Sequence, residues 1–179
     1  MNQRKKDIYF LRKAFEFASK YSQDKETQTG TAIVTNEKTY FGANRLKRGL
    51  EGRFEGKGNR IVFGRPEKYS LLEHSEEDAL ETVREEKASL MGATAYITWD
   101  PCDKCAKKLV DAGIRRVVVP ETTRLTHNSS LRDEKRREYW NKSFIKSKKI
   151  FKEHGVRYDT IKGKIGGKEI KFDGKQFNP

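Results

Sequence analysis

The sequence has few of the features that mark secreted or membrane-spanning proteins. It contains only 2 Cys, and these lie too close in the chain to form the disulfide framework of a small secreted domain. No apolar stretch approaches the roughly 18 residues that a membrane-spanning helix needs. The basic N-terminal segment, residues 1–18, lacks a continuous apolar core and a small-residue cleavage site, so it does not indicate a signal peptide. These absences predict a cytoplasmic protein that does not act at a membrane.

The sequence is also poor in hydrophobic residues and rich in charge. Hydrophobic residues make up 34% of the 179 residues and charged residues 36%, which suits one domain with a small core and solvated helices. The net charge is +13, and the segment from Arg132 to the C-terminus has 15 Lys and Arg against 7 Asp and Glu. This excess indicates either attraction to phosphate groups, on a nucleotide or on a polymer, or a solvated basic helix and tail.

Hydrophobic periodicity predicts a succession of helices and strands. Apolar residues recur at spacings of three and four between Ile8 and Ala18, which predicts an amphipathic helix. Two β-rich runs separated by a short polar turn predict a hairpin. The elements expected in chain order are a helix at 5–22, strands at 31–35 and 38–43, a long loop at 45–70, a helix from Ser75 to about Lys87, a strand at 93–99, a helix at 103–113, a strand at 114–120, a polar loop at 121–132, a helix at 134–155 and a strand at 156–161.

The order of these elements predicts an α/β fold. Strands alternate with helices in the second half of the chain, which implies parallel pairing and helices on both faces of the sheet. We therefore expect a three-layer α/β/α sandwich around a mixed five-stranded sheet, formed by residues 1–161. The basic tail, residues 162–179, is expected to form a small hairpin about Gly166-Gly167 or to be loose. On the last helix, an apolar stripe is expected to contain Tyr139, Phe144, Ile145 and Phe151.

Four residues in two short motifs predict a metal centre. Cys102 and Cys105 open a predicted helix, and positions three apart share one helix face, so both sulfurs can bind one ion. The helix N-terminus favours thiolates, and Zn²⁺ prefers thiolate and imidazole ligands. His74, at the start of the preceding predicted helix, supplies a third ligand and leaves a fourth position for water. Glu76 lies two residues further on, where its carboxylate can exchange protons with that water.

Simpler interpretations of the same motifs remain open at this point. The Cys102–Cys105 pair is also compatible with a thioredoxin-like redox site, although that site does not explain His74 or Glu76. A closed structural zinc site would need a further ligand, for which His127 and His154 are available. A metal-stabilised binding module without activity is a third interpretation, but it gives Glu76 no role.

The motifs His74-Ser75-Glu76 and Pro101-Cys102-Asp103-Lys104-Cys105 resemble the signature of the zinc-dependent cytidine/deoxycytidylate deaminase superfamily. The resemblance covers roughly residues 5–160 and is greatest to deoxycytidylate deaminases. It implies Zn²⁺ held by His74, Cys102 and Cys105, hydrolytic removal of an exocyclic amine with Glu76 carrying protons, and a homo-oligomer. The substrate that it favours is dCMP, converted to dUMP with release of ammonia.

The resemblance also implies substrate contacts. Asn44 matches the family's sugar-binding Asn, Gln28 matches a Gln near the 5′-phosphate, and the chain near Asp100 is expected to position the amine. Three positions depart from the family: Thr27 replaces an Arg, Asp78 an Asn and Arg45 a Gly. The first two departures weaken the expected phosphate contact, and the third argues against the allosteric nucleotide-binding loop of the family's regulated members. The missing positive charge could be supplied by cations of the predicted loop, namely Arg45, Lys47, Arg48 and Arg65.

Other substrates remain open. Another cytosine nucleoside or nucleotide would suit the same centre. The basic segment from Arg132 to the C-terminus also fits deamination of a base in single-stranded nucleic acid. Tyr139 and Trp140 are candidate stacking residues for it, although their helical pattern favours the core.

Overall fold

A computed structural model describes residues 2–24, 26–50, 68–123 and 134–179. Arg65, His127 and most of the two predicted loops therefore lie outside the described residues. The helices and strands, in chain order, are α1 (Gln3–Tyr21), β1 (Gly30–Val34), β2 (Thr39–Ala43), β3 (Arg45–Leu46), α2 (Lys68–Leu71), β4 (Leu72–Glu73), α3 (Ser75–Glu85), β5 (Thr94–Ile97), α4 (Asp103–Asp111), β6 (Arg116–Pro120), α6 (Glu134–Glu153), β7 (Arg157–Ile161), β8 (Ile170–Phe172) and β9 (Lys175–Phe177).

The main sheet has five strands in the order β2-β1-β5-β6-β7. β1 is antiparallel to both of its neighbours, and β5, β6 and β7 are parallel. The mixed five-stranded sheet predicted from the order of elements is thus confirmed. Helices α4 and α6 connect these parallel strands. Because β5, β6 and β7 are parallel, their C-terminal ends all lie at the same edge of the sheet.

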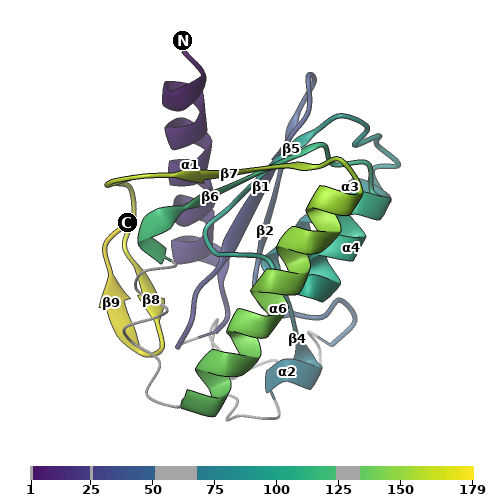
Figure 1. The fold of residues 1–179 in the computed structure, drawn as a ribbon. Helices are drawn as coiled ribbons and strands as arrows, with labels where there is room; N and C mark the ends of the chain where they lie inside the picture. The colour runs from purple at the N-terminus through teal and green to yellow at the C-terminus, as the bar shows by residue number, and fades with distance from the viewer. Residues whose placement is uncertain (1, 25, 51–67, 124–133) are drawn as a thin grey trace.

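Helices cover both faces of this sheet, which confirms the three-layer prediction (Figure 1). α1 packs on one face, where the apolar stripe predicted between Ile8 and Ala18 is largely buried with Tyr96 and Val118. α3, α4 and α6 lie on the other face over a second cluster that includes Ile97, Leu109 and Val117. No described helix has the length and apolar character needed to cross a bilayer.

The predicted stripe on α6 was wrong at two of its four positions. Phe144 and Phe151 are buried, but Tyr139 is 64% and Ile145 is 69% exposed. Neighbouring residues in a helix point about 100° apart, so Ile145 cannot share the face of Phe144. The prediction that Tyr139 belongs to the core fails for the same geometric reason, because it lies five residues before Phe144.

The C-terminal tail forms a hairpin, but not at the predicted turn. β8 pairs with β9, and the turn between them is Asp173-Gly174 rather than Gly166-Gly167. Asp173 and Gly174 both have positive φ, 49° and 78°, as a two-residue turn of type I′ requires. The Asp-Gly pair is the sequence feature that would have identified this turn, because Asp and Gly tolerate this conformation better than most residues.

Candidate active site

His74, Cys102 and Cys105 come together where two helices begin. His74 is the N-cap residue of α3, and Cys102 is the N-cap residue of α4. His74 Nδ1 lies 3.6 Å from Cys102 Sγ and 3.4 Å from Cys105 Sγ. The three possible ligand atoms all lie within 4.8 Å of one another. Residues that are 28 positions apart in the chain therefore form one cluster, as the two motifs predicted.

The spacing of this cluster fits Zn²⁺. Zn–S bonds of about 2.3 Å and Zn–N bonds of about 2.0–2.1 Å in a tetrahedral site separate a nitrogen from a sulfur ligand by about 3.6 Å. Both observed separations between the imidazole and the sulfurs match that value. Within the described part of the chain the cluster offers three ligands, which is the number typical of catalytic zinc sites that keep a position for water.

The two sulfurs have different electrostatic environments. A hydrogen bond from Cys105 and the nearby His74 imidazole lower the pKa of Cys102 to about 4, against the opposing effect of burial. The same hydrogen bond and burial raise the pKa of Cys105. The backbone N–H of Cys105 also donates to Cys102 Sγ at the helix N-terminus. At neutral pH the pair therefore provides at least one thiolate, the form that binds a metal.

Glu76 lies in the first turn of α3, two residues after His74, and is 5% exposed. Its carboxylate accepts a hydrogen bond from Ser75 Oγ at 3.1 Å, and burial raises its pKa. Ser75 Oγ is also 2.8 Å from Thr31 Oγ1 on β1. The sequence predicted no role for Ser75, yet its hydroxyl links Glu76 to the sheet.

The first turn of α3 is held unusually close to the end of β2. A Cβ atom at Gly42 would lie 2.2 Å from the Ser75 carbonyl oxygen and 2.4 Å from Ala79 N, so only glycine fits there. On the same turn, Asp78 accepts a hydrogen bond of 2.9 Å from Ala43 N. Both contacts fix the position of the first turn of α3 relative to β2, and with it the position of Glu76.

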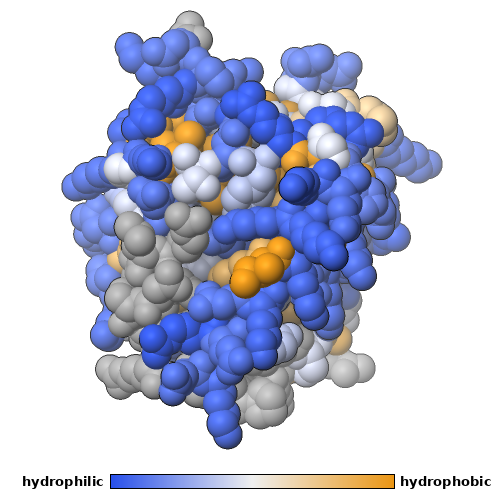
Figure 2. Space-filling model, viewed as in Figure 1, coloured by the Kyte–Doolittle hydropathy of each residue, from blue (hydrophilic) through white to orange (hydrophobic). Residues whose placement is uncertain are grey.

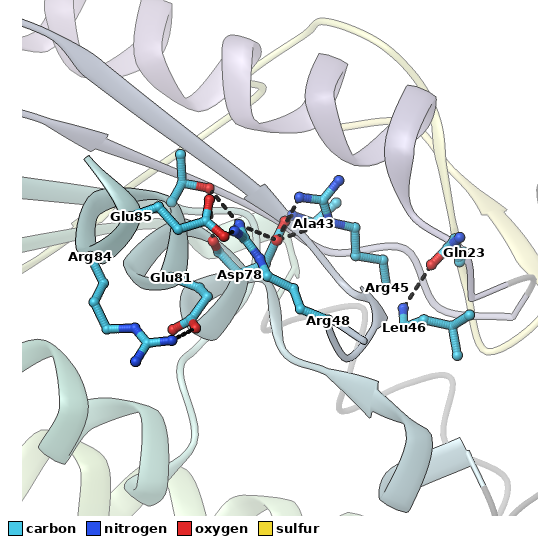
Figure 3. Close-up of polar contacts among 10 residues, drawn as sticks. Gln23, Ala43, Arg45, Leu46, Arg48, Asp78, Glu81, Arg84 and Glu85 are labelled. Atoms are coloured by element: carbon cyan, nitrogen blue, oxygen red, sulfur yellow. Dashed lines mark hydrogen bonds and ion pairs between the residues drawn. The ribbon is translucent and has the colours of Figure 1, made fainter. Parts of the chain in front are cut away.

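Asp78 also forms ion pairs with Arg45 and Arg48, two of the residues predicted to supply positive charge for a phosphate (Figure 3). Its Oδ1 atom lies 2.8 Å from Arg45 Nε, 2.7 Å from Arg45 Nη2 and 3.6 Å from Arg48 Nη2. Arg48 forms a second ion pair with Glu85. The two positions expected to depart from the family, 45 and 78, thus form one ion pair between a guanidinium and a buried carboxylate.

The other residues predicted to contact the substrate form hydrogen bonds or ion pairs with residues that do not belong to the metal cluster. The Asn44 side chain accepts from Ser22 Oγ and Thr29 N, and donates to Thr27 O. Gln28 Oε1 accepts from the backbone N–H of Lys171, and Lys47 Nζ donates to Ser70 O. Asp100 accepts from Tyr158 and lies 3.5 Å from Lys148 Nζ.

Trp140 lies near the cluster, although the sequence proposed it only as a stacking residue for single-stranded nucleic acid and its helical pattern favoured the core. The ring of Trp140, on α6, lies 6.4 Å from the His74 ring between centroids and stacks on Phe144. Its approach to His74 was not predicted, because the two residues lie far apart in the chain and no local pattern links them. Tyr139, its neighbour, points into solvent instead.

Comparison with known proteins identifies the family. Residues 4–121 match the model of the cytidine and deoxycytidylate deaminase zinc-binding region, and the chain belongs to this family. This result confirms the resemblance inferred from the two motifs, and the cluster of His74, Cys102 and Cys105 fits the zinc ion that the family binds.

Several of the relatives are deoxycytidylate deaminases. The mouse enzyme is 29% identical over 117 residues, which are 62% of this chain and 61% of that protein, and the human enzyme is 28% identical over the same shares. The matched segment thus spans about three fifths of these relatives. The structure of dCMP deaminase from cyanophage S-TIM5 covers 90% of this chain and 100% of its own, with a TM-score of 0.62 and 19% identity, which supports the fold.

Proposed function

We propose that this protein removes the exocyclic amine of a cytosine nucleotide by hydrolysis, and that its substrate is dCMP, converted to dUMP and ammonia. The observation that carries this proposal is the convergence of one imidazole and two thiols with a buried carboxylate in the adjacent helical turn. Family membership and the names of the mouse and human relatives support the same substrate class. The cyanophage S-TIM5 enzyme has been solved with dCMP and dUMP, which supports the choice of nucleotide for a related fold.

His74, Cys102 and Cys105 are proposed to hold Zn²⁺. Bound there, the ion would acidify a water molecule, which is the nucleophile of hydrolytic deamination. Glu76 is proposed to take a proton from that water and to deliver protons to the ring nitrogen and to the leaving amine. The hydrogen bond from Ser75 Oγ limits the rotation of the Glu76 carboxylate, which supports this role.

Residues around the centre are proposed to position the nucleotide. Asn44 donates one of its two amide N–H groups to Thr27 O, and the other is assigned to a sugar hydroxyl. Gln28 and Arg45 are assigned to the 5′-phosphate, and the chain at Asp100 to the amine. The face of Trp140 beside His74 offers a stacking surface for the pyrimidine ring. Assembly into a homo-oligomer and a cytoplasmic location stay predictions.

A panel of substrates tests this function. We expect release of ammonia from dCMP at a rate well above that from cytosine, cytidine, deoxycytidine and CMP, and none from adenosine. A preference for the free nucleosides would refute the assigned phosphate contacts. No release from any cytosine compound by protein that contains zinc would refute deamination of this class.

Deamination of a single-stranded nucleic acid is the second candidate. Exposed Tyr139 lies edge-on to Trp140 at 5.5 Å between ring centroids, and the exposed face of α6 presents Lys142, Lys146 and Lys149. Figure 2 shows that hydrophilic residues cover most of the face that includes α6, around a small hydrophobic patch. Steep salt-dependent binding of single-stranded DNA or RNA, with uracil formed in the polymer, would favour this candidate. Absence of binding at physiological salt would remove it.

A further inference from the structure

The C-terminal hairpin, β8 and β9, is built into the core on the α1 side of the sheet (Figure 1). Ile170, Phe172 and Phe177 are buried there with Leu11 and Phe15 of α1. The last residue is fixed as well, because the carbonyl of Pro179 accepts a hydrogen bond of 2.7 Å from Gly166 N. The hairpin is therefore held firmly enough to restrain whatever it contacts.

One of its contacts is the segment that leads into the metal cluster. The Phe172 ring stacks on the Trp99 ring, with centroids 4.0 Å apart and an angle of 17° between the planes. Phe177 meets the same indole edge-on at 6.2 Å. Trp99 is buried and lies three residues before Cys102, so the hairpin packs against the start of the Trp99–Cys102 connection.

The other contact is the segment 26–29. Gly174 N donates to Glu26 O at 2.8 Å, and Asp173 N donates to Thr27 Oγ1 at 3.2 Å. Lys171 exchanges two hydrogen bonds with Gln28, of 2.9 Å and 2.8 Å. This segment in turn holds the amide of Asn44 through Thr27 O and Thr29 N.

We propose that the C-terminal hairpin is a positioning element of the active site, which fixes Asn44 and the Trp99 segment in the geometry that binds the nucleotide. This inference rests on the proposed function. The metal ligands are anchored separately, because Glu77 accepts a hydrogen bond from His74 N and Cys102 caps α4. Loosening the hairpin should therefore weaken substrate binding while zinc remains bound.

The test compares three variants of the full-length zinc protein. Phe172→Ala removes the ring that stacks on Trp99, and Phe172→Leu restores most of the lost volume. Gln176→Ala is the matched control, because this exposed side chain lies on the same hairpin and contacts Glu169. For each variant, KM and kcat for dCMP, zinc content and melting temperature are measured, with kinetics taken well below the lowest melting temperature.

We expect Phe172→Ala to raise KM for dCMP about tenfold, the size of effect expected when roughly one hydrogen bond to the nucleotide is lost. Its kcat and zinc content should stay within about twofold of the wild type, because a contact that binds substrate and transition state equally affects KM alone. Phe172→Leu should recover most of the affinity, and Gln176→Ala should match the wild type. If Phe172→Ala does not fold, Phe172→Leu takes its place, because leucine keeps the volume but lacks the ring that stacks on Trp99. A KM for dCMP at least about twofold above the wild-type value then supports the inference, and a KM equal to the wild-type value contradicts it.

Two outcomes separate this inference from the proposed function. A lower melting temperature with unchanged KM in the Phe172 variants would show that the hairpin only stabilises the fold, and the inference would be wrong. Failure of the wild-type protein to deaminate dCMP would instead overturn the proposed substrate, and this inference with it.

Discussion

Removal of the Asp78 carboxylate should destabilise the protein far more than removal of an exposed carboxylate on the same helix. The Asp78 side chain is fully buried and bonds both to Ala43 N and to Arg45, so it connects α3 to the end of β2 (Figure 3). In Asp78→Ala, the Ala43 N–H loses its partner in the interior and the guanidinium of Arg45 loses its counter-charge.

The size of the effect follows from these contacts. Breaking a buried ion pair by removing one partner costs about 3–5 kcal/mol. Arg45 is 35% exposed and can be partly rehydrated, so we expect the lower end, about 3 kcal/mol. Asp78→Asn keeps an acceptor for Ala43 N and should cost only about 1–2 kcal/mol.

Urea denaturation of both variants checks these values. Glu81→Ala is the control, because Glu81 forms a largely exposed ion pair with Arg84 on the same helix, and such pairs contribute about 0.3–0.5 kcal/mol. A loss in Asp78→Ala no larger than that of the control would show that the buried pair does not hold α3 to β2.

Three further predictions concern the fit of α3, the ion pair at Asp7 and the metal. Gly42→Ala should displace the first turn of α3 and lower both the free energy of unfolding and kcat, since the added methyl would clash with Ser75 O; a neutral effect on both would contradict the tight fit. Although burial raises it, hydrogen bonds from Arg116 and other neighbours hold the pKa of Asp7 below its usual value. A depressed pKa adds stability above about pH 4 that is lost at lower pH, so the stability difference between wild type and Asp7→Asn should be largest near pH 7 and shrink in acid, as measured by thermal unfolding across pH. Cys105→Ser should lose most of its bound zinc in metal analysis after dialysis, whereas retention of wild-type zinc content would exclude this sulfur as a ligand.

The sequence allowed the sheet and the metal cluster to be predicted because both leave local patterns. Spacings of three and four predicted α1, and alternating or continuous apolar runs predicted the five strands of the sheet. The pair of Cys at the start of α4 is local as well. Only the proximity of His74 to these sulfurs depends on the tertiary fold. It could be predicted because the two motifs together resemble the signature of a known family.

Contacts between distant segments were not predictable in the same way. The stack of Trp99 on Phe172, the pairing of Arg45 with Asp78 and the approach of Trp140 to His74 all join positions far apart in the chain. Each of these contacts depends on how whole helices and strands pack against one another. The periodicity of apolar residues within one element carries no information about that packing. The hairpin turn differs, because its Asp-Gly pair is a local signal in the sequence, whereas the Gly-Gly pair at 166–167 lies outside the turn.

The most direct test of the account measures zinc content and ammonia release from dCMP side by side for the wild type and Glu76→Gln. We expect about one zinc per chain in both proteins, since Glu76 is not assigned as a ligand, and turnover in the variant lower by about 10²–10⁴-fold. Wild-type turnover in Glu76→Gln, or full activity of the wild type after removal of its metal, would contradict the account.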